Sequence, residues 1–158
     1  MNRFTYLLPV LVVLMLGACA TTPTFNEIEI STPKQPEKAS IYVYRPFAMY
    51  GFSTSPYLHI DNDKCLLQEN RFLLFQVKPG VKKIETKWGF FSRPMGTKDT
   101  SQSLTVDAGK TYYLKFSLMP YRSAGSPVLN SEGFELKVLE ENQARIELAD
   151  FHLNKCKS

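Results

Sequence analysis

Residues 104–118 read LTVDAGKTYYLKFSL, two alternating segments joined by a turn. Leu104 and Val106 precede the turn at residues 108–110. After the turn, apolar side chains occupy every second position as far as Leu118. A period of two places alternate side chains on opposite faces of a strand. The stretch therefore predicts a β-hairpin that turns one face toward a hydrophobic core.

The same pattern recurs along most of the chain. Asn62-Asp63 is a polar turn, Glu69 to Arg71 is a second turn, and Lys78-Pro79-Gly80-Val81 has the Pro and Gly of a type II turn. The expected strands are residues 41–44, 57–61, 64–68, 72–77, 82–88, 104–106, 112–118 and 134–138. This spacing predicts a mostly β fold, a single antiparallel β-sandwich of about seven to eight strands, in a domain over residues 39–158.

Two segments outside these strands are ambiguous. Residues 140–150 fit a short C-terminal helix, because Ala144, Leu148 and Phe151 would share a face, but Ile146 and Leu148 also fit a strand. Residues 19–38 contain three prolines and predict a tether, within which the alternation of residues 25–30 also fits an edge strand. An extended tether of this length would reach about 60 Å.

The first 18 residues form a basic and then an apolar segment. Arg3 precedes the uncharged stretch 7–16, which as a helix would cover roughly 15 Å and is too short to span a bilayer. Residues 16–19, LGAC, resemble the lipobox of bacterial lipoproteins. The resemblance implies cleavage of residues 1–18 as a signal peptide, attachment of diacylglycerol to Cys19, and acylation of the new N-terminus with a fatty acid such as palmitate.

Several acyl chains would anchor the protein stably in a membrane. Residue 20 is Ala and not Asp, which by analogy with Gram-negative sorting favours the outer membrane over the inner one. We therefore expect a cell-envelope protein, lipid-anchored in the outer membrane through Cys19, with its domain in the periplasm. The alternative is a plain signal peptide that happens to end before a cysteine.

Three sequence motifs carry a wider resemblance. They are IYVYRP at residues 41–46, KPG at residues 78–80 and AGKTYYLKF at residues 108–116. Together they resemble a family of bacterial lipoproteins with an uncharacterised domain of unknown function, over about residues 39–138. The resemblance implies a β domain on a lipid anchor and carries over no activity.

Cys19 aside, two cysteines remain in an exported chain. We expect Cys65 and Cys156 to form a disulfide, with two unpaired thiols as the alternative. A two-residue turn at Asn62-Asp63 would pair Ile60 with Cys65 and would place the Cys65 side chain on the inner face.

Sites for metals, cofactors and catalysis are not indicated. His59 and His152 could complete a zinc site with the two cysteines, but His59 falls on the opposite face from Cys65, so no metal and no cofactor are expected. Asp61 and Asp63 lack the glycine and glutamate of a calcium loop. Without residues 1–18, and so without Arg3, the formal charge falls from +4 to +3, which is too diffuse for nucleic acid.

The three long connections, residues 47–56, 89–101 and 121–131, fall on alternate links between strands, which would place them at one end of the sandwich. Aromatic and arginine side chains on such loops are typical of binding faces. The alternative is that the aromatic side chains fold back and cap the core. The candidate binding residues are Phe47, Tyr50, Phe52, Trp88, Phe90, Phe91, Arg93, Tyr121 and Arg122.

These observations favour a non-enzymatic binding or structural module. Its expected partners are the membrane, through acylated Cys19, and an envelope protein or a glycan, without nucleic acid. The alternative is an envelope hydrolase acting on a cell-wall or surface substrate, with a serine beside His59 or His152.

Overall fold

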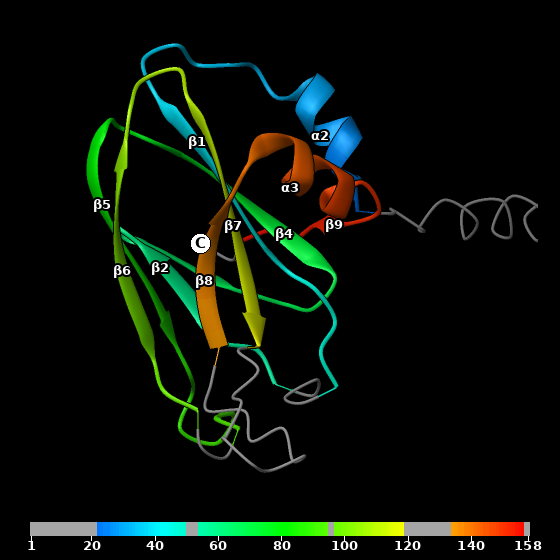
Figure 1. The fold of residues 1–158 in the computed structure, drawn as a ribbon, viewed down its shortest axis with the longest axis vertical. Coiled ribbons are helices and arrows are strands. Elements are labelled where there is room, and N and C mark those ends of the chain that lie inside the picture. Colours follow the sequence, from blue (N-terminus) through cyan, green and yellow to red (C-terminus); the bar gives the residue numbers. More distant parts are fainter. Residues whose placement is uncertain (1–21, 50–53, 95–96, 119–133, 157–158) are drawn as a thin grey trace, which may run out of the picture.

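Two β-sheets face each other in the computed structural model, which describes residues 22–49, 54–94, 97–118 and 134–156 (Figure 1). The strands of this part are β1 (Ala39–Arg45), β2 (Tyr57–Ile60), β3 (Asp63–Leu66), β4 (Arg71–Val77), β5 (Gly80–Lys87), β6 (Thr100–Val106), β7 (Thr111–Leu118), β8 (Phe134–Leu139) and β9 (His152–Leu153). The helices are α2 (Phe25–Ser31) and α3 (Glu141–Leu148). The predicted mostly β sandwich is therefore confirmed, with β9 as an unexpected addition.

The strand order shows how the chain crosses between the layers. One sheet has the order β8-β7-β1-β4-β9 and the other has the order β3-β2-β5-β6. Most neighbours are antiparallel, but β1 pairs with β7 and β4 pairs with β9 in parallel. The predicted antiparallel pairing therefore holds for the other neighbours, and these two parallel pairs were not expected. The chain leaves the first sheet after β4 and returns as β7 after three reversals of direction, so β7 runs opposite to β4 and in the direction of β1.

The turn between β2 and β3 lies one residue earlier than the sequence predicts. Leu58 pairs with Cys65 and Ile60 pairs with Asp63, because Asp61 takes the first turn position with a φ of 52°. Aspartate tolerates this left-handed conformation better than most residues. The register moves by two positions, so the Cys65 side chain still faces the core.

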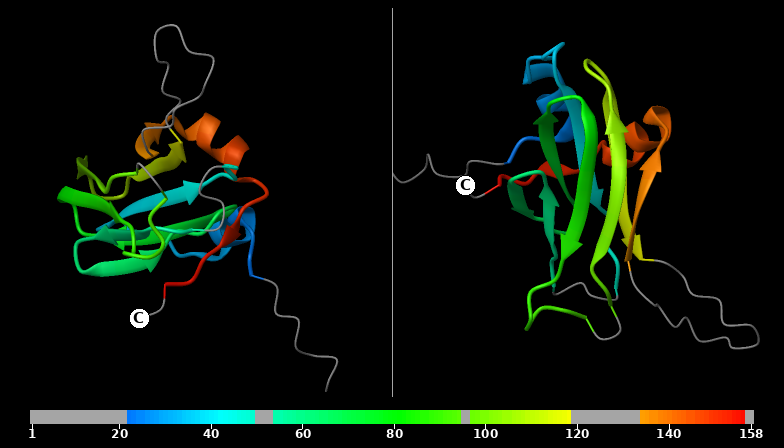
Figure 2. Two further views of the ribbon diagram at one scale, coloured as in Figure 1. Left: turned by 90° about the horizontal axis from the view of Figure 1, so that it is seen from below. Right: turned by 90° about the vertical axis from the view of Figure 1, so that its left-hand side faces the viewer.

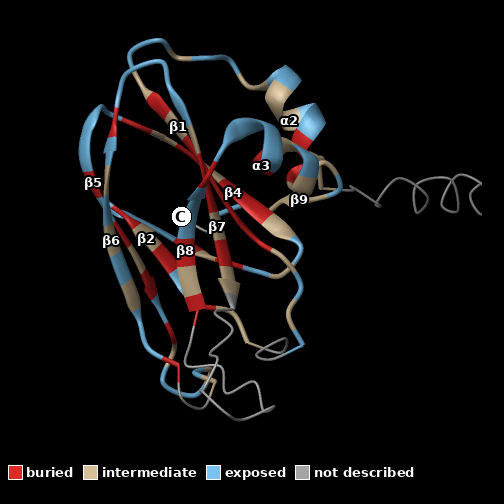
Figure 3. Ribbon diagram, viewed as in Figure 1, coloured by how far each residue is buried: buried red, intermediate tan, exposed pale blue. Residues whose placement is uncertain are grey.

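The core lies between the two sheets and is closed to solvent along most of its length (Figure 3). Every second residue of β1 and β4 contributes to it, as the alternation predicts. The other face of the larger sheet is also covered, because α2 and α3 pack on it. This second layer explains why β1 is buried on both faces.

The segment expected to form a free tether belongs instead to the folded domain. Thr24 caps α2 through a capping box with Glu27, and the Phe25 side chain is 1% exposed. The backbone N–H of Leu153 donates to the carbonyl of Pro23 at 2.8 Å. Residues 25–30 therefore form a helix rather than an edge strand, and residues 22–38 cover the sheet. An apolar first residue with a complete cap favours this arrangement.

Residues 141–148 resolve the other ambiguity in favour of a helix. Ala144 and Leu148 are the buried positions of α3, and the helix packs near β7. Arg145 forms ion pairs with Glu29 of α2 and Glu141 of its own helix, so the two helices are bound to each other. Within the described residues, neither helix has the length and apolarity needed to cross a membrane.

Candidate functional site

The strand ends that carry the three long connections meet at one end of the sandwich, which we call the loop end (Figure 1). Each of strands β1 to β8 runs opposite to the one before it. The connections after β1, β3, β5 and β7 therefore leave from the same end. The residues between 46 and 70 that precede β4 include a true turn, in which Asn70 has a φ of 51°.

Arg45 is the centre of the loop end. Its side chain is 0% exposed and donates to the carbonyls of Thr54 at 2.7 Å and Leu67 at 3.4 Å. It also forms an ion pair with Glu69 at 2.9 Å. The guanidinium carbon lies 6.0 Å from the centre of the Trp88 ring and 5.5 Å from that of Phe134. One side chain thus contacts residues at all four connections.

Burial controls the electrostatics of this pair. It lowers the pKa of Arg45 and raises the pKa of Glu69, and the charge of each partner opposes the effect on the other. Arginine nevertheless stays protonated in proteins. Glu69 is thus held beside a permanent buried cation. The same cation, Arg45, contacts residues of all four connections.

Sequence reasoning missed Arg45, although a signal was present. Ile41 and Val43 point into the core, and the alternation places Arg45 on the same face. A charged residue in an inward position indicates a buried ion pair or a functional cation. In the structure Arg45 is part of a buried ion pair, and its partner is Glu69.

Large apolar side chains project from the loop end into solvent. Phe90 is 90% exposed and Phe91 is 97% exposed, and their rings lie 5.0 Å apart in an edge-to-face arrangement. Phe47 and Met49, which follow β1, are also exposed. Aromatic side chains that contact one another but not the core are typical of a binding surface.

The other candidate loop residues divide into three groups. Trp88 is 6% exposed and packs on Phe116 and Phe134, so it belongs to the core and its assignment to the binding loops is corrected. Arg93 lies at the loop end in an exposed ion pair with Asp99 at 2.8 Å. The remaining candidates lie outside the described residues; they are Tyr50, Phe52, Tyr121 and Arg122.

The two histidines lie in different sheets. His59 is in β2, where burial, with the charges of Lys87 and Lys64, lowers its pKa. His152 is in β9, and its Nδ1 lies 2.8 Å from the carbonyl of Thr22. Within the described residues, no hydrogen bond joins either ring to a serine, and no group of three or more His, Cys, Asp or Glu side chains is placed to hold a metal ion.

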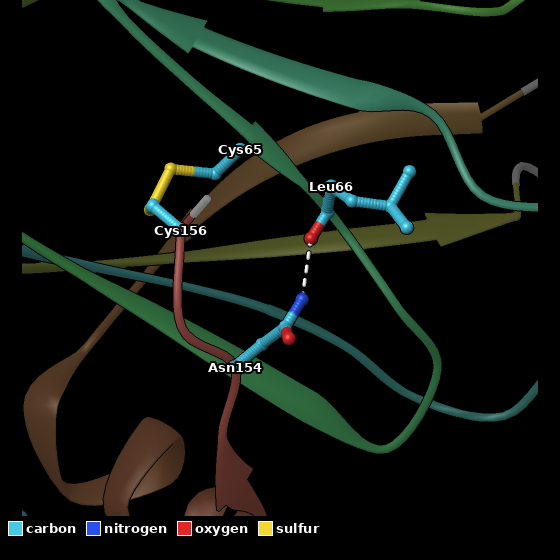
Figure 4. The surroundings of a disulfide bond; sticks show 4 residues. All are labelled: Cys65, Leu66, Asn154 and Cys156. Carbon is cyan, nitrogen blue, oxygen red and sulfur yellow. Dashed lines mark hydrogen bonds between the residues drawn. A yellow bond between two sulfur atoms is a disulfide. The ribbon is translucent and has the colours of Figure 1, made fainter. Parts of the chain in front are cut away.

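A disulfide joins Cys65 of β3 to Cys156, 91 positions later in the chain (Figure 4). The Cα atoms are 4.8 Å apart. Close by, the side-chain amide of Asn154 donates to the carbonyl of Leu66 at 2.6 Å. The bond fastens the C-terminal segment to the edge of the smaller sheet. Because both sulfur atoms are used in the disulfide, neither cysteine is free to bind zinc.

A small polar cavity lies under the two helices, on the far side of the larger sheet. Tyr42 and Tyr113 stack there at 5.4 Å, and burial raises the pKa of Tyr42 to about 12. Hydrogen bonding to Glu29 raises the pKa of Arg145 beside them. The cavity measures about 60 Å³, far below the usual size of a ligand pocket. These groups therefore serve to hold the helices on the sheet.

Comparison with known proteins identifies one related family. Residues 35–126 match the model described as "Protein of unknown function (DUF2846)", which is more than half of the chain. The match contains β1 to β7, whereas α2, β8, α3, β9 and Cys156 lie outside it. No curated protein shows significant similarity to the chain.

Proposed function

The chain belongs to the DUF2846 family, and on the geometry of its loop end we propose that it is a lipid-anchored, non-enzymatic binding module of the cell envelope. The anchor is acylated Cys19 in the outer membrane, and the domain lies in the periplasm. The partner is an envelope protein or a glycan, bound through the exposed aromatic side chains of the loop end.

The observation that carries the binding role is the pair Phe90 and Phe91. Both side chains are almost fully exposed, while nearby Trp88 is buried in the core. An exposed apolar pair lowers solubility unless a partner covers it. The pair is also mounted on a rigid base, because Trp88 contacts both Phe116 and Phe134. A fixed base reduces the entropy lost when the loop orders on binding.

Replacing both Phe90 and Phe91 with alanine should abolish binding of the partner. We expect mild crosslinking in intact cells, followed by recovery of the protein, to yield at least tenfold less of the crosslinked species than the wild type. The effect follows from truncating two aromatic side chains at the centre of an interface, each typically worth more than 1 kcal/mol. The free energy of unfolding of the variant should equal that of the wild type, since neither side chain packs on the core.

Ile146→Ala provides the matched control. Ile146 is also a large exposed apolar residue, but it lies on α3 rather than at the loop end. Its replacement should leave the crosslinked species unchanged. Equal yields from the wild type and from the Phe90→Ala/Phe91→Ala protein would rule out the loop end as the binding surface.

Replacing Cys19 with alanine should abolish lipid attachment and processing together. The variant should incorporate no labelled fatty acid and should retain residues 1–18, because the lipobox reading requires the modified cysteine for cleavage. Mass spectrometry of the purified protein measures both effects. Cys156→Ala is the control and should be acylated normally. Cleavage and acylation of the Cys19→Ala protein would refute the anchor.

A further inference from the structure

A groove of about 440 Å³ lies beside the β2–β3 hairpin, within the usual range of ligand pockets. The hairpin forms one wall and the segment after β9 forms the other. The lining residues are Tyr57, Lys64, Leu66, Gln68, Asn154 and Lys155. None of these six described residues is acidic, so the groove carries the two positive charges of its lysines.

The two walls are held together at fixed positions. The disulfide between Cys65 and Cys156 links the residues that follow Lys64 and Lys155 in the chain, and the Asn154 amide bonds the carbonyl of Leu66 (Figure 4). Both lysines are exposed. The groove is therefore preformed, which lowers the entropic cost of binding.

The side chains of the groove match an anionic headgroup. The Lys64 ammonium lies over the Tyr57 ring, 4.2 Å from its centre, which holds the charge at the groove surface. Lys155 supplies a second cation, and Gln68 and Asn154 supply amides that hydrogen-bond to phosphate and hydroxyl oxygens. Exposed lysines beside a membrane attract anionic lipids.

The groove also lies close to the start of the folded chain. The N–H of Leu153 donates to Pro23, and Arg71 of β4 donates to the Thr22 hydroxyl at 2.6 Å. In both views of Figure 2 the first described residues and the segment after β9 leave on the same side of the domain. Only four positions separate Pro23 from Cys19, a reach of at most about 14 Å. An acyl chain on Cys19 would thus keep this side at the membrane surface.

We propose that the groove between Lys64 and Lys155 binds the phosphate-bearing headgroup of an anionic phospholipid in the membrane that holds the acyl chains. This inference rests on the lipid anchor proposed above. It gives the domain a defined orientation, with the groove at the β3 edge of the smaller sheet lying against the lipid surface.

Lysine labelling on vesicles tests the groove. The full lipidated protein is reconstituted in vesicles of phosphatidylcholine alone or of phosphatidylcholine with phosphatidylglycerol, and an amine-reactive reagent is followed by mass spectrometry. Lys64 and Lys155 should react about fivefold more slowly on the anionic vesicles. Lys137 of β8, at the opposite edge of the larger sheet, should react equally on both. High salt should remove the protection, because the attraction is electrostatic.

Hydrogen exchange of the hairpin gives a second readout in variants. Phosphatidylglycerol should slow exchange around Cys65 in the wild type and in Lys137→Glu, and should have no effect in Lys64→Glu/Lys155→Glu. All three proteins should fold, since the changed lysines are exposed.

The possible failures are distinguishable. A protein that carries no acyl chain and does not float with either vesicle refutes the anchor. A protein that floats with both, and whose Lys64 and Lys155 react equally on both, refutes the groove and leaves the anchor intact. Protection by an added acidic polysaccharide, without protection by phosphatidylglycerol, would also overturn the lipid assignment.

Discussion

Arg45→Met should lower the free energy of unfolding by about 3–5 kcal/mol. Methionine keeps most of the side-chain volume, so the loss arises from the polar groups that Arg45 leaves behind. Glu69 would remain as a largely buried carboxylate without its cation, and the carbonyls of Thr54 and Leu67 would lose a donor. Urea unfolding of the purified protein, compared with the wild type, measures the difference.

Arg93→Met is the matched control at the same end of the molecule. Arg93 also pairs with a carboxylate, that of Asp99 at 2.8 Å, but both side chains are more than 40% exposed. Exposed ion pairs contribute about 0–1 kcal/mol, so this variant should unfold almost like the wild type. Equal losses in Arg45→Met and Arg93→Met would show that burial of the pair has no special weight.

A double variant separates the stranded charge from the lost contacts. In Arg45→Met/Glu69→Leu the buried carboxylate is gone as well, and we expect part of the stability to return. Replacement of both members of a buried pair by apolar residues is often close to neutral. If the double variant were less stable than Arg45→Met alone, the carboxylate of Glu69 would be stabilising the loop end by another route.

The strands were predictable where one face packs on the core and the other face is more exposed to solvent. In β2 the buried positions Leu58 and Ile60 alternate with the more exposed Tyr57 and His59, and the sequence pattern reflects this directly. The pattern fails for β9, because its two residues are too few to show a period. It also misreads residues 25–30, where Ile28 and Ile30 have the spacing of a strand and Phe25 and Ile28 have the spacing of a helix. Only the cap at Thr24 distinguishes the helix.

The sequence predicted where the candidate site lies, but it did not predict which of the loop residues are exposed there. Strict reversal of successive strands places the long connections together, and this follows from chain order alone. Which aromatic side chain turns inward depends on the space between the sheets. Trp88 fills it because Phe116 and Phe134 leave room beside Arg45, whereas Phe90 and Phe91 lie beyond the end of β5. No local pattern contains that information.

The groove beside β3 was also beyond sequence reasoning, because its walls are some 90 positions apart. Cysteine counting predicted the bond between them, but the turn register was predicted wrongly, and the side chains near the bond follow from that register. Tyr57 and Lys64 meet because Tyr57 pairs with Leu66 and His59 with Lys64. With the predicted register, Lys64 would lie opposite Asp61.

Loss of the disulfide should have the second large effect on stability. Cys156→Ser should lower the free energy of unfolding by about 2–4 kcal/mol, measured by urea unfolding without reductant. The loop closed by Cys65 and Cys156 spans 91 positions, so the bond removes much conformational freedom from the unfolded chain. Cys156 is exposed, so serine there creates no cavity, and Cys65 remains a small apolar side chain in the core.

Hydrogen exchange shows which parts of the domain are destabilised in Cys156→Ser. If the bond works through the unfolded chain, the slowest amides of β1 and β4 should exchange faster by the factor that the unfolding free energy gives. If it only holds the C-terminal segment, the N–H groups of Leu153 and Asn154, which donate to Pro23 and Phe72, should exchange faster while β1 stays unchanged. We expect both groups to respond, because backbone hydrogen bonds join the segment around β9 to the start of α2, and the two segments should therefore be released together. Unchanged urea midpoints with or without the bond would contradict this view, and would mean that the packing of Phe25 on the sheet holds the chain ends without help from the disulfide.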